Sequence, residues 1–252
     1  MGTNLKKLIA VALLPLLTFA SWEMDFDELW ATAGGWSNPY ITDGLVAMWD
    51  GEWNAGGGKH NPEAVVWKDL IGDCDITLSE GFSFSTDELV AEPGSSAFSS
   101  QMVSIAANNY TCELLFACGT EEETAAFVNH WRIGNLVGFS FANYLYRYSV
   151  YWSGTRVFNK PATWNIGPST PRYSRYVLAT IVIDYTANTF DVYYNGELIM
   201  ADNAAGSTKS DYMVELSCAR TCYTKRLGYY NRALTPAEIA HNYTVDKARF
   251  GL

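Results

Sequence analysis

The chain has 252 residues, of which 48% are hydrophobic and 17% are charged, and its formal net charge is −10. That composition excludes a disordered polyelectrolyte, because the apolar share is large enough for a folded core. The negative charge repels phosphate backbones, so we expect no nucleic-acid partner. The length fits one large all-β domain, and one domain is the simplest expectation.

At the N-terminus, Lys6 and Lys7 precede an apolar run from Leu8 to Phe19, which ends at the small residue Ala20. A positive start, a short apolar centre and a small final residue are typical of a secretory signal peptide. The run is too short for the ~30 Å hydrocarbon core of a membrane, which needs about 20 apolar residues. We therefore predict a signal peptide over residues 1–20, a secreted or cell-surface protein, and no membrane insertion after cleavage.

Residues 21–43 form an acidic and aromatic segment that leads into a linker rich in Gly, Ser and Thr. Trp22, Phe26, Leu29 and Trp30 recur at helical spacing and predict a short amphipathic helix. The β pattern begins after this segment, so the main domain is predicted over residues 44–252.

From Gly44 onward, short alternating or apolar runs are separated by turn residues, which is typical of sandwiches and barrels. Asn195-Gly196 lies between two such runs and predicts a type I′ hairpin turn, because both residues tolerate positive φ. The fold class we expect is all-β, a two-sheet antiparallel jelly-roll sandwich. The clearest predicted strands cover residues 44–49, 64–70, 110–117, 136–141, 144–152 and 178–185, with the hairpin over 189–200.

A helix is predicted only near the C-terminus. Thr235 and Glu238 have the spacing of a capping box, and Pro236 occupies the first helical position. Leu234 and Ile239 fit the hydrophobic staple around the cap. We expect a short helix from Pro236 to about Ala248.

Five cysteines would meet an oxidising compartment after export, and their odd number leaves one thiol over. Cys112 and Cys118 fall about 20 Å apart on one strand face at ~3.3 Å per residue, too far for a direct bond. Cys218 and Cys222 can pair only if a turn intervenes, so the pairing among these four and Cys74 stays open. Metal binding is disfavoured, because there is no C-x-x-C pair and the three histidines, His60, His130 and His241, are scattered.

Several segments resemble the laminin-G-like and concanavalin-A-like jelly-roll family. They are Tyr110–Phe116, Tyr176–Tyr185, Asp191–Leu198 and Leu227–Ile239, in the order seen in that family. The most specific part is the closing pattern Asn231-Arg-Ala-Leu-Thr-x-x-Glu-Ile239. The resemblance covers roughly residues 45 to 250 and implies two packed antiparallel sheets and, commonly, the binding of sugars or other surface ligands.

Jelly-roll glucanases similar to this fold use an E-x-D-x-x-E strand, and Glu23, Asp25 and Glu28 match that spacing. In such enzymes two carboxylates flank the glycosidic bond about 5 to 5.5 Å apart. Glu23 and Glu28 would point to opposite faces of a strand, and they precede the predicted sandwich. An acidic surface helix explains them better, so we expect no catalytic residues.

Asp50, Glu52 and Asn54 place oxygen ligands at alternate positions before Gly56, which resembles the first half of a calcium loop. The bidentate acid expected later in such a loop is absent, and a solvated polar turn explains the same residues. No cofactor is required, and Ca²⁺ is the one ion that this pattern suggests.

Aromatic residues make up 15% of the chain, and their faces can stack on the C–H faces of sugar rings. Tyr144, Tyr146, Tyr148 and Trp152 share one face of a predicted strand, as a glycan platform or as a buried inner face of the sandwich. Trp53 and His60 lie in a Gly-rich loop, where ligand contacts are common.

The sequence thus predicts an exported, non-catalytic carbohydrate-binding or adhesion module whose partner is a glycan or glycoconjugate. Two alternatives stay open. One is a glycoside hydrolase or lyase on the same fold, and the other is a structural protein-protein interaction domain of a surface or phage-like assembly. The oligomeric state is not predicted.

Overall fold

The structure is a computed structural model that describes residues 37–103, 109–118, 128–133, 137–142, 147–152, 155–161, 176–203, 212–217 and 221–252. Residues 1–37 and 38–252 form separate units, and the fold described below is that of the second. The predicted signal peptide and the residues 21–36 of the acidic segment lie outside the described residues.

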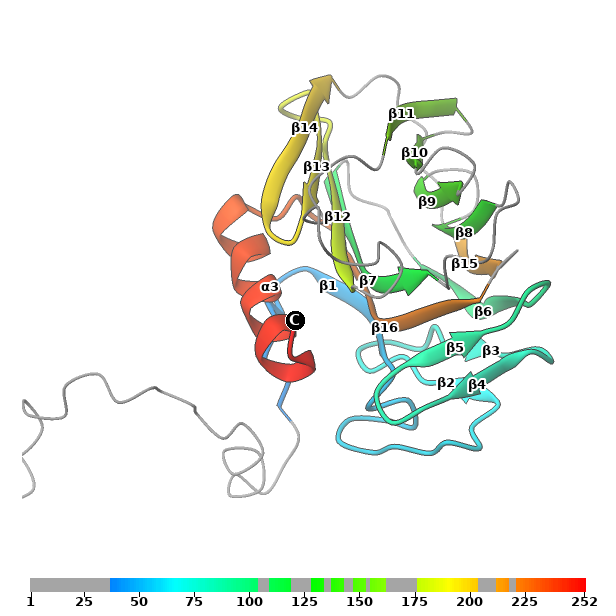
Figure 1. Ribbon diagram of the computed structural model, residues 1–252. Helices are drawn as coiled ribbons and strands as arrows, with labels where there is room; N and C mark the ends of the chain where they lie inside the picture. The colour runs from blue at the N-terminus through cyan, green and yellow to red at the C-terminus, as the bar shows by residue number, and fades with distance from the viewer. Residues whose placement is uncertain are drawn as a thin grey trace, which may run out of the picture. The chain divides into compact units, whose positions relative to one another are not determined.

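Two antiparallel sheets form the layers of the domain (Figure 1). In the first sheet, the strands follow the order β14-β13-β12-β7-β16-β5-β4, and β1 also pairs with β16. Their bounds are β1 Leu45–Asp50, β4 Phe82–Phe84, β5 Leu89–Ala91, β7 Asn109–Cys118, β12 Val177–Asp184, β13 Thr189–Tyr194, β14 Glu197–Asn203 and β16 Cys222–Tyr230.

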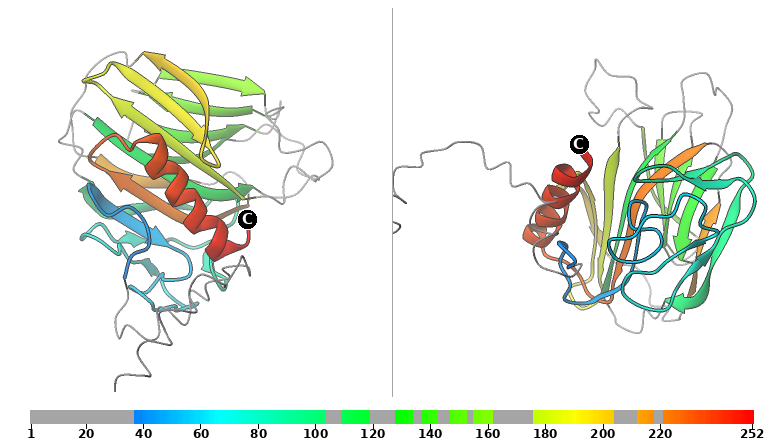
Figure 2. Two further views of the ribbon diagram at one scale, coloured as in Figure 1. Left: turned by 90° about the vertical axis from the view of Figure 1, so that its left-hand side faces the viewer. Right: turned by 90° about the horizontal axis from the view of Figure 1, so that it is seen from below.

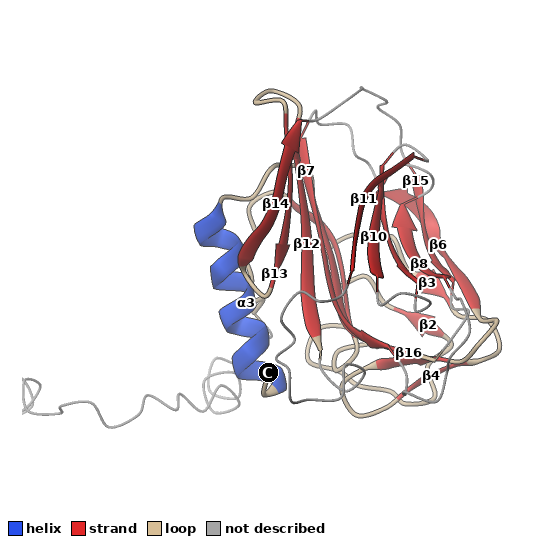
Figure 3. Ribbon diagram, turned by 45° about the horizontal axis from the view of Figure 1, so that its top comes forward, coloured by secondary structure: helices blue, strands red, loops and turns tan. Residues whose placement is uncertain are grey.

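The second sheet has the order β11-β10-β9-β8-β15-β6-β3-β2 and faces the first across the core (Figure 3). Its strands are β2 Val66–Trp67, β3 Ile76–Thr77, β6 Ser96–Val103, β8 Val128–Ile133, β9 Val137–Ala142, β10 Arg147–Trp152, β11 Thr155–Pro161 and β15 Tyr212–Ser217. The chain crosses between the sheets repeatedly, which confirms the predicted antiparallel sandwich.

The main core lies between the two sheets. On β7 the alternate residues Cys112, Leu114 and Phe116 belong to it, as the period-two pleat requires. From the other sheet, Ile76 and Leu216 contribute buried side chains to the same cluster. The strand predicted over residues 110–117 is therefore confirmed as β7, which lies in the middle of the first sheet.

A second core lies on the outer face of the first sheet, under helix α3 (Pro236–Phe250) (Figure 2). Val182 from β12 and Tyr193 from β13 pack there with Leu234 and Ile239. The first sheet is thus buried on both faces, which explains why β12 is an almost continuous apolar run.

The predicted capping box is confirmed. The Thr235 side chain accepts a hydrogen bond from the Glu238 amide, and the Glu238 carboxylate accepts one from the Thr235 amide at 2.8 Å. The helix continues to Phe250, slightly beyond the predicted end, and stops at Gly251, which has a left-handed φ of 65°.

The predicted hairpin turn is also confirmed. Asn195 and Gly196 have φ values of 52° and 80°, the positive pair that a type I′ turn needs. The Asn195 side-chain oxygen accepts a hydrogen bond from the Leu178 amide at 3.0 Å, which ties the turn to β12.

The predicted strand over residues 64–70 is shorter in the structure, where β2 covers Val66–Trp67 only. The Asp69 carboxylate accepts hydrogen bonds from the amides of Met48, Ile71 and Cys74. These hydrogen bonds hold the backbone in a local turn where the prediction had a strand. The apolar pattern of the sequence did not indicate this alternative. Among the described residues, no helix is long and apolar enough to cross a membrane.

Candidate functional site

The loop after β1, residues 51–61, carries two of the predicted ligand contacts and is called the Trp53 loop. The amide of Gly51 donates to the carbonyl of Lys225 on β16 at 2.8 Å, which fixes the start of the loop. Asn54 is fully buried and closes the loop: its side-chain nitrogen donates to the Asn61 carbonyl at 2.7 Å, and its oxygen accepts from the Asn61 amide at 2.8 Å. The conformation of the loop is therefore held by hydrogen bonds between its own residues.

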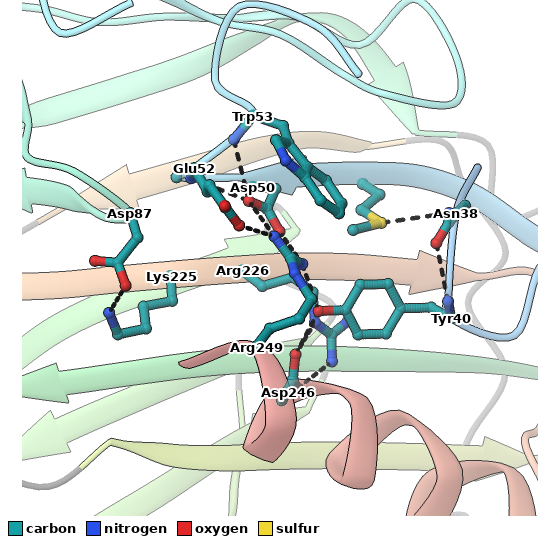
Figure 4. A network of polar contacts seen from close by, with 12 residues as sticks. Asn38, Tyr40, Asp50, Glu52, Trp53, Asp87, Lys225, Arg226, Asp246 and Arg249 are labelled. Atoms are coloured by element: carbon teal, nitrogen blue, oxygen red, sulfur yellow. Dashed lines mark hydrogen bonds and ion pairs between the residues drawn. The ribbon is translucent and has the colours of Figure 1, made fainter. Parts of the chain in front are cut away.

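Arg249, in the last turn of α3, supports the Trp53 loop from within the protein (Figure 4). Its guanidinium donates to both carboxylate oxygens of Asp50, at 2.7 and 3.2 Å, and to Glu52 at 2.5 Å. The Asp50 carboxylate in turn accepts hydrogen bonds from the amides of Glu52 and Trp53. The guanidinium carbon lies 3.6 Å from the centre of the Trp53 ring, a stacked cation–π contact.

The charges of this contact stabilise one another. Burial alone would lower the pKa of Arg249, but the neighbouring carboxylates, Asp50 first, raise it far above its usual range. Asp50 is fully buried, so it depends on the guanidinium for its counter-charge. The Trp53 ring therefore rests on a cation that is charged at every accessible pH.

A second group of charges lies beside the first, under α3, and is called the helix-docking network: Tyr40, Glu113, Arg226, Asn242 and Asp246. Arg226 on β16 donates to both oxygens of Asp246 on the helix, at 2.9 and 2.8 Å, and to Glu113 on β7 at 3.0 Å. Asn242 donates to Glu113 at 3.0 Å, and the Tyr40 hydroxyl donates to Asp246 at 2.7 Å.

These five side chains are almost completely buried. Burial raises the pKa of Glu113, and the charge of Arg226 opposes that rise. Since the members bond one another and come from β7, β16, α3 and the segment before β1, the network fixes the helix on the sheet. We assign it a structural role.

Lys225 marks the boundary between the Trp53 loop and the β4–β5 hairpin. Its ammonium pairs with Asp87 at 2.6 Å and with Glu88 at 3.8 Å. It also lies 4.5 Å from the centre of the Tyr176 ring and 5.1 Å from that of Phe250. The Tyr176 hydroxyl donates to Glu88, whose pKa is raised chiefly by burial.

The β4–β5 hairpin and the Trp53 loop pack closely at Gly51. A Cβ atom at this position would lie 2.4 Å from the Glu88 Cα, so only glycine fits there without a shift of the backbone. Around the Trp53 loop, the cations Lys225 and Arg249 thus contact aromatic rings while they pair with carboxylates. A ligand there would meet a preformed surface instead of a loose loop.

The structure places the predicted ligand residues in two different parts of the fold. Trp53 is half-buried against Arg249, while His60 is exposed, with its Nδ1 3.2 Å from the Gly51 carbonyl oxygen and 3.1 Å from that of Glu52. Both therefore lie in one loop, beside the first sheet. Tyr148 and Trp152 belong to β10 of the second sheet, but their side chains lie outside the description, as do residues Tyr144 and Tyr146 entirely.

The oxygens of the predicted calcium ligands have partners from the protein. Asp50 and Glu52 bind Arg249, and the Asn54 oxygen binds the Asn61 amide. Among the described residues, no group of three or more His, Cys, Asp or Glu side chains is placed to hold a metal ion. A calcium ion at Asp50 and Glu52 would have to compete with the guanidinium of Arg249.

The role of Arg249 was not predicted from the sequence, nor were those of Arg226 and Asp246. A signal for two of them was present in the helix, where Asn242, Asp246 and Arg249 follow the buried Ile239 at spacings of one helical face. Polar residues at those positions indicate buried partners, but they do not identify them.

No protein-family model matches the sequence, and no curated protein matches it either. Solved structures do share the fold. The binding domain of botulinum neurotoxin serotype D superposes with a TM-score of 0.65 at 10% sequence identity, covering 81% of this chain and 52% of that chain. A Trypanosoma rangeli sialidase in complex with 2,3-difluorosialic acid gives a TM-score of 0.59 at 13% identity, covering 86% of this chain and 36% of that chain.

The chain thus spans about half the length of the neurotoxin domain and little more than a third of the sialidase. At these identities the likeness concerns the fold. It supports the β-sandwich class that the sheets define.

Proposed function

We propose that this chain is a non-catalytic, laminin-G-like carbohydrate-binding module that contacts its glycan through the Trp53 loop. Two kinds of support come from outside the site. Among the solved structures with this fold are a receptor-binding domain and a sialidase bound to a sialic acid derivative. The segments that resemble laminin-G-like domains include most of β7 and β12, the β13–β14 turn, and the second half of β16 with the start of α3.

The observation that carries the proposal is the stacking of Trp53 on Arg249 within a loop braced at both ends. Rigid aromatic faces suit the C–H faces of sugars, and a preorganised loop loses little conformational entropy when it binds. His60, exposed in the same loop, adds a polar ring nearby. This arrangement favours recognition of a sugar over catalysis, because the Asp50 and Glu52 carboxylates are held by Arg249.

We also propose export, with cleavage after Ala20, on the strength of the leader pattern. Intact-mass analysis of the protein recovered from an expressing culture tests this. The mature chain should begin at Ser21, and a retained leader would contradict the proposal.

A panel of immobilised glycans tests the binding proposal. The wild-type protein should bind at least one class of glycan, and Trp53→Ala and His60→Ala should each weaken that binding about tenfold or more. His241→Ala is a matched control for His60, because His241 is likewise exposed and bonds a backbone carbonyl, that of Pro39 at 3.0 Å. Binding to no glycan, or equal loss in the control, would contradict the proposal, and release of product from any glycan would favour the glycoside hydrolase or lyase instead.

A further inference from the structure

Cys118 and Cys222 lie directly opposite each other where β7 and β16 pair. Cys118 is the last residue of β7, and Cys222 is the first residue of β16. Opposite residues in an antiparallel pair have Cα atoms about 4.5 to 5.5 Å apart, within the ~4.4 to 6.8 Å that a disulfide spans. The backbone register alone therefore brings the two positions within bonding range.

Both positions fall on the core side of the first sheet. Cys222 is fully buried in the main core, to which Cys112 and Phe116 of β7 also belong. Cys118 is the next alternate position after Phe116, and residues opposite each other in a ladder share a face. By register, the two backbone positions therefore belong to one face of the sheet.

We propose that Cys118 and Cys222 form a cross-strand disulfide when the protein is oxidised. Joining two cysteine thiols requires a two-electron oxidant. A disulfide oxidant such as oxidised glutathione accepts two electrons and leaves as two thiols. The protein loses two protons and gains one Sγ–Sγ bond, through a mixed disulfide on one of the two cysteines.

The other described cysteines are poorly placed to compete. Cys112 stands opposite Tyr229 on one side and Ile181 on the other, so neither neighbouring strand offers it a cysteine. Cys74 lies between β2 and β3 of the second sheet, outside the ladder that joins β7 to β16. Cys218 lies outside the described residues.

The bond would join the two central strands of the first sheet at the end of their ladder, beyond Glu113 and Arg226 of the helix-docking network. It would also close a long loop, since more than a hundred residues separate the two positions. In the chain-entropy model, closing a long loop restricts the unfolded state strongly. Oxidation should therefore raise the denaturant midpoint of the protein.

A peptide map of the wild-type chain decides the pairing without any variant. The full-length protein is equilibrated with a mixture of oxidised and reduced glutathione, alkylated in denaturant and digested without reductant. We expect one cross-linked peptide pair containing Cys118 and Cys222, which dithiothreitol removes, and a fall in titratable thiols from five to three. Five thiols, or a peptide pair linking Cys222 to Cys218, would overturn the proposal.

Variants then test the effect on stability. Dithiothreitol should lower the urea midpoint of the wild type and of Cys112→Ser, which keeps the pair and serves as the control. It should leave the midpoints of Cys118→Ser and Cys222→Ser unchanged. A wild-type midpoint that does not respond to the reductant would contradict the expected stabilisation, and the peptide map remains decisive if a serine variant fails to fold.

Discussion

The guanidinium of Arg249 stacks 3.6 Å from the centre of the Trp53 ring while it binds both oxygens of Asp50. Arg249 belongs to the last turn of α3, and Asp50 ends β1, so the two ends of the folded domain meet under the Trp53 loop. The C-terminal helix thereby becomes part of the candidate site instead of a distant cap.

Replacing Arg249 should destabilise the protein strongly. Arg249→Met would leave the fully buried Asp50 carboxylate without its counter-charge, a change that typically costs about 3 to 5 kcal/mol. Urea unfolding measures the loss. Lys247→Met, an exposed change in the same helical turn, should alter stability by less than about 0.5 kcal/mol. A loss in Arg249→Met as small as that of the control would show that Asp50 does not depend on the arginine.

The contribution of an Asp–Arg pair to the free energy of unfolding depends on how deeply the pair is buried. Asp246 and Asp43 each pair with an arginine, at 2.8 and 2.9 Å, but the Asp246 side chain is 0% exposed and that of Asp43 is 87% exposed. Asp246→Asn should lower the free energy of unfolding by about 3 kcal/mol, because the buried guanidinium of Arg226 loses one of its two carboxylate partners and its two-point contact with the helix. Asp43→Asn should lower it by less than about 0.5 kcal/mol. Similar losses in both variants would contradict a structural role for the helix-docking network.

The helix cap should depend on pH in a defined direction. Hydrogen bonds from Arg232 lower the pKa of Glu238 to about 2. The folded-state pKa is below the unfolded one, so the stabilisation is complete above the unfolded pKa of about 4.3 and is lost as the pH falls toward 2. Wild type should therefore be more stable than Glu238→Gln at pH 7, and the difference should shrink as the pH falls from about 4.5 to 2. Thermal unfolding at both pH limits measures this, and a difference that does not change with pH would be inconsistent with it.

Calcium and Arg249 should compete for the same oxygens. If the ion binds Asp50 and Glu52, it raises the thermal midpoint, because it binds the native state. We expect a larger rise in Arg249→Met than in the wild type, since the variant leaves those oxygens available. Scanning calorimetry with calcium or with a chelator provides the comparison. A midpoint that calcium leaves unchanged in both proteins would exclude calcium at this loop.

Local rules predicted most of the elements of the first sheet and the helix. Asn195-Gly196 and the Thr235–Glu238 box each have one favourable backbone geometry, so the sequence was sufficient at both places. The strand over residues 64–70 was predicted too long, because the Asp69 carboxylate binds three amides and competes with the ladder. Apolar periodicity does not contain that information.

The candidate site was predicted only in part. The Trp53 loop was found from its glycines and from the presence of a tryptophan and a histidine among them, which are local features. Arg249 was missed, because its contacts with Asp50 and Trp53 join positions that are far apart in the chain. These positions come together only when α3 packs onto the first sheet. A local sequence pattern does not predict contacts between such distant positions.

Glycan binding through the Trp53 loop is tested by titrating the ¹⁵N-labelled protein with the glycan that binds best on the panel. Amide and indole chemical-shift changes map the binding surface. We expect the largest changes on the Trp53 loop, including the Trp53 indole, and we expect them to disappear in Trp53→Ala. Changes confined to β8–β11 of the second sheet, or no changes at all, would contradict it.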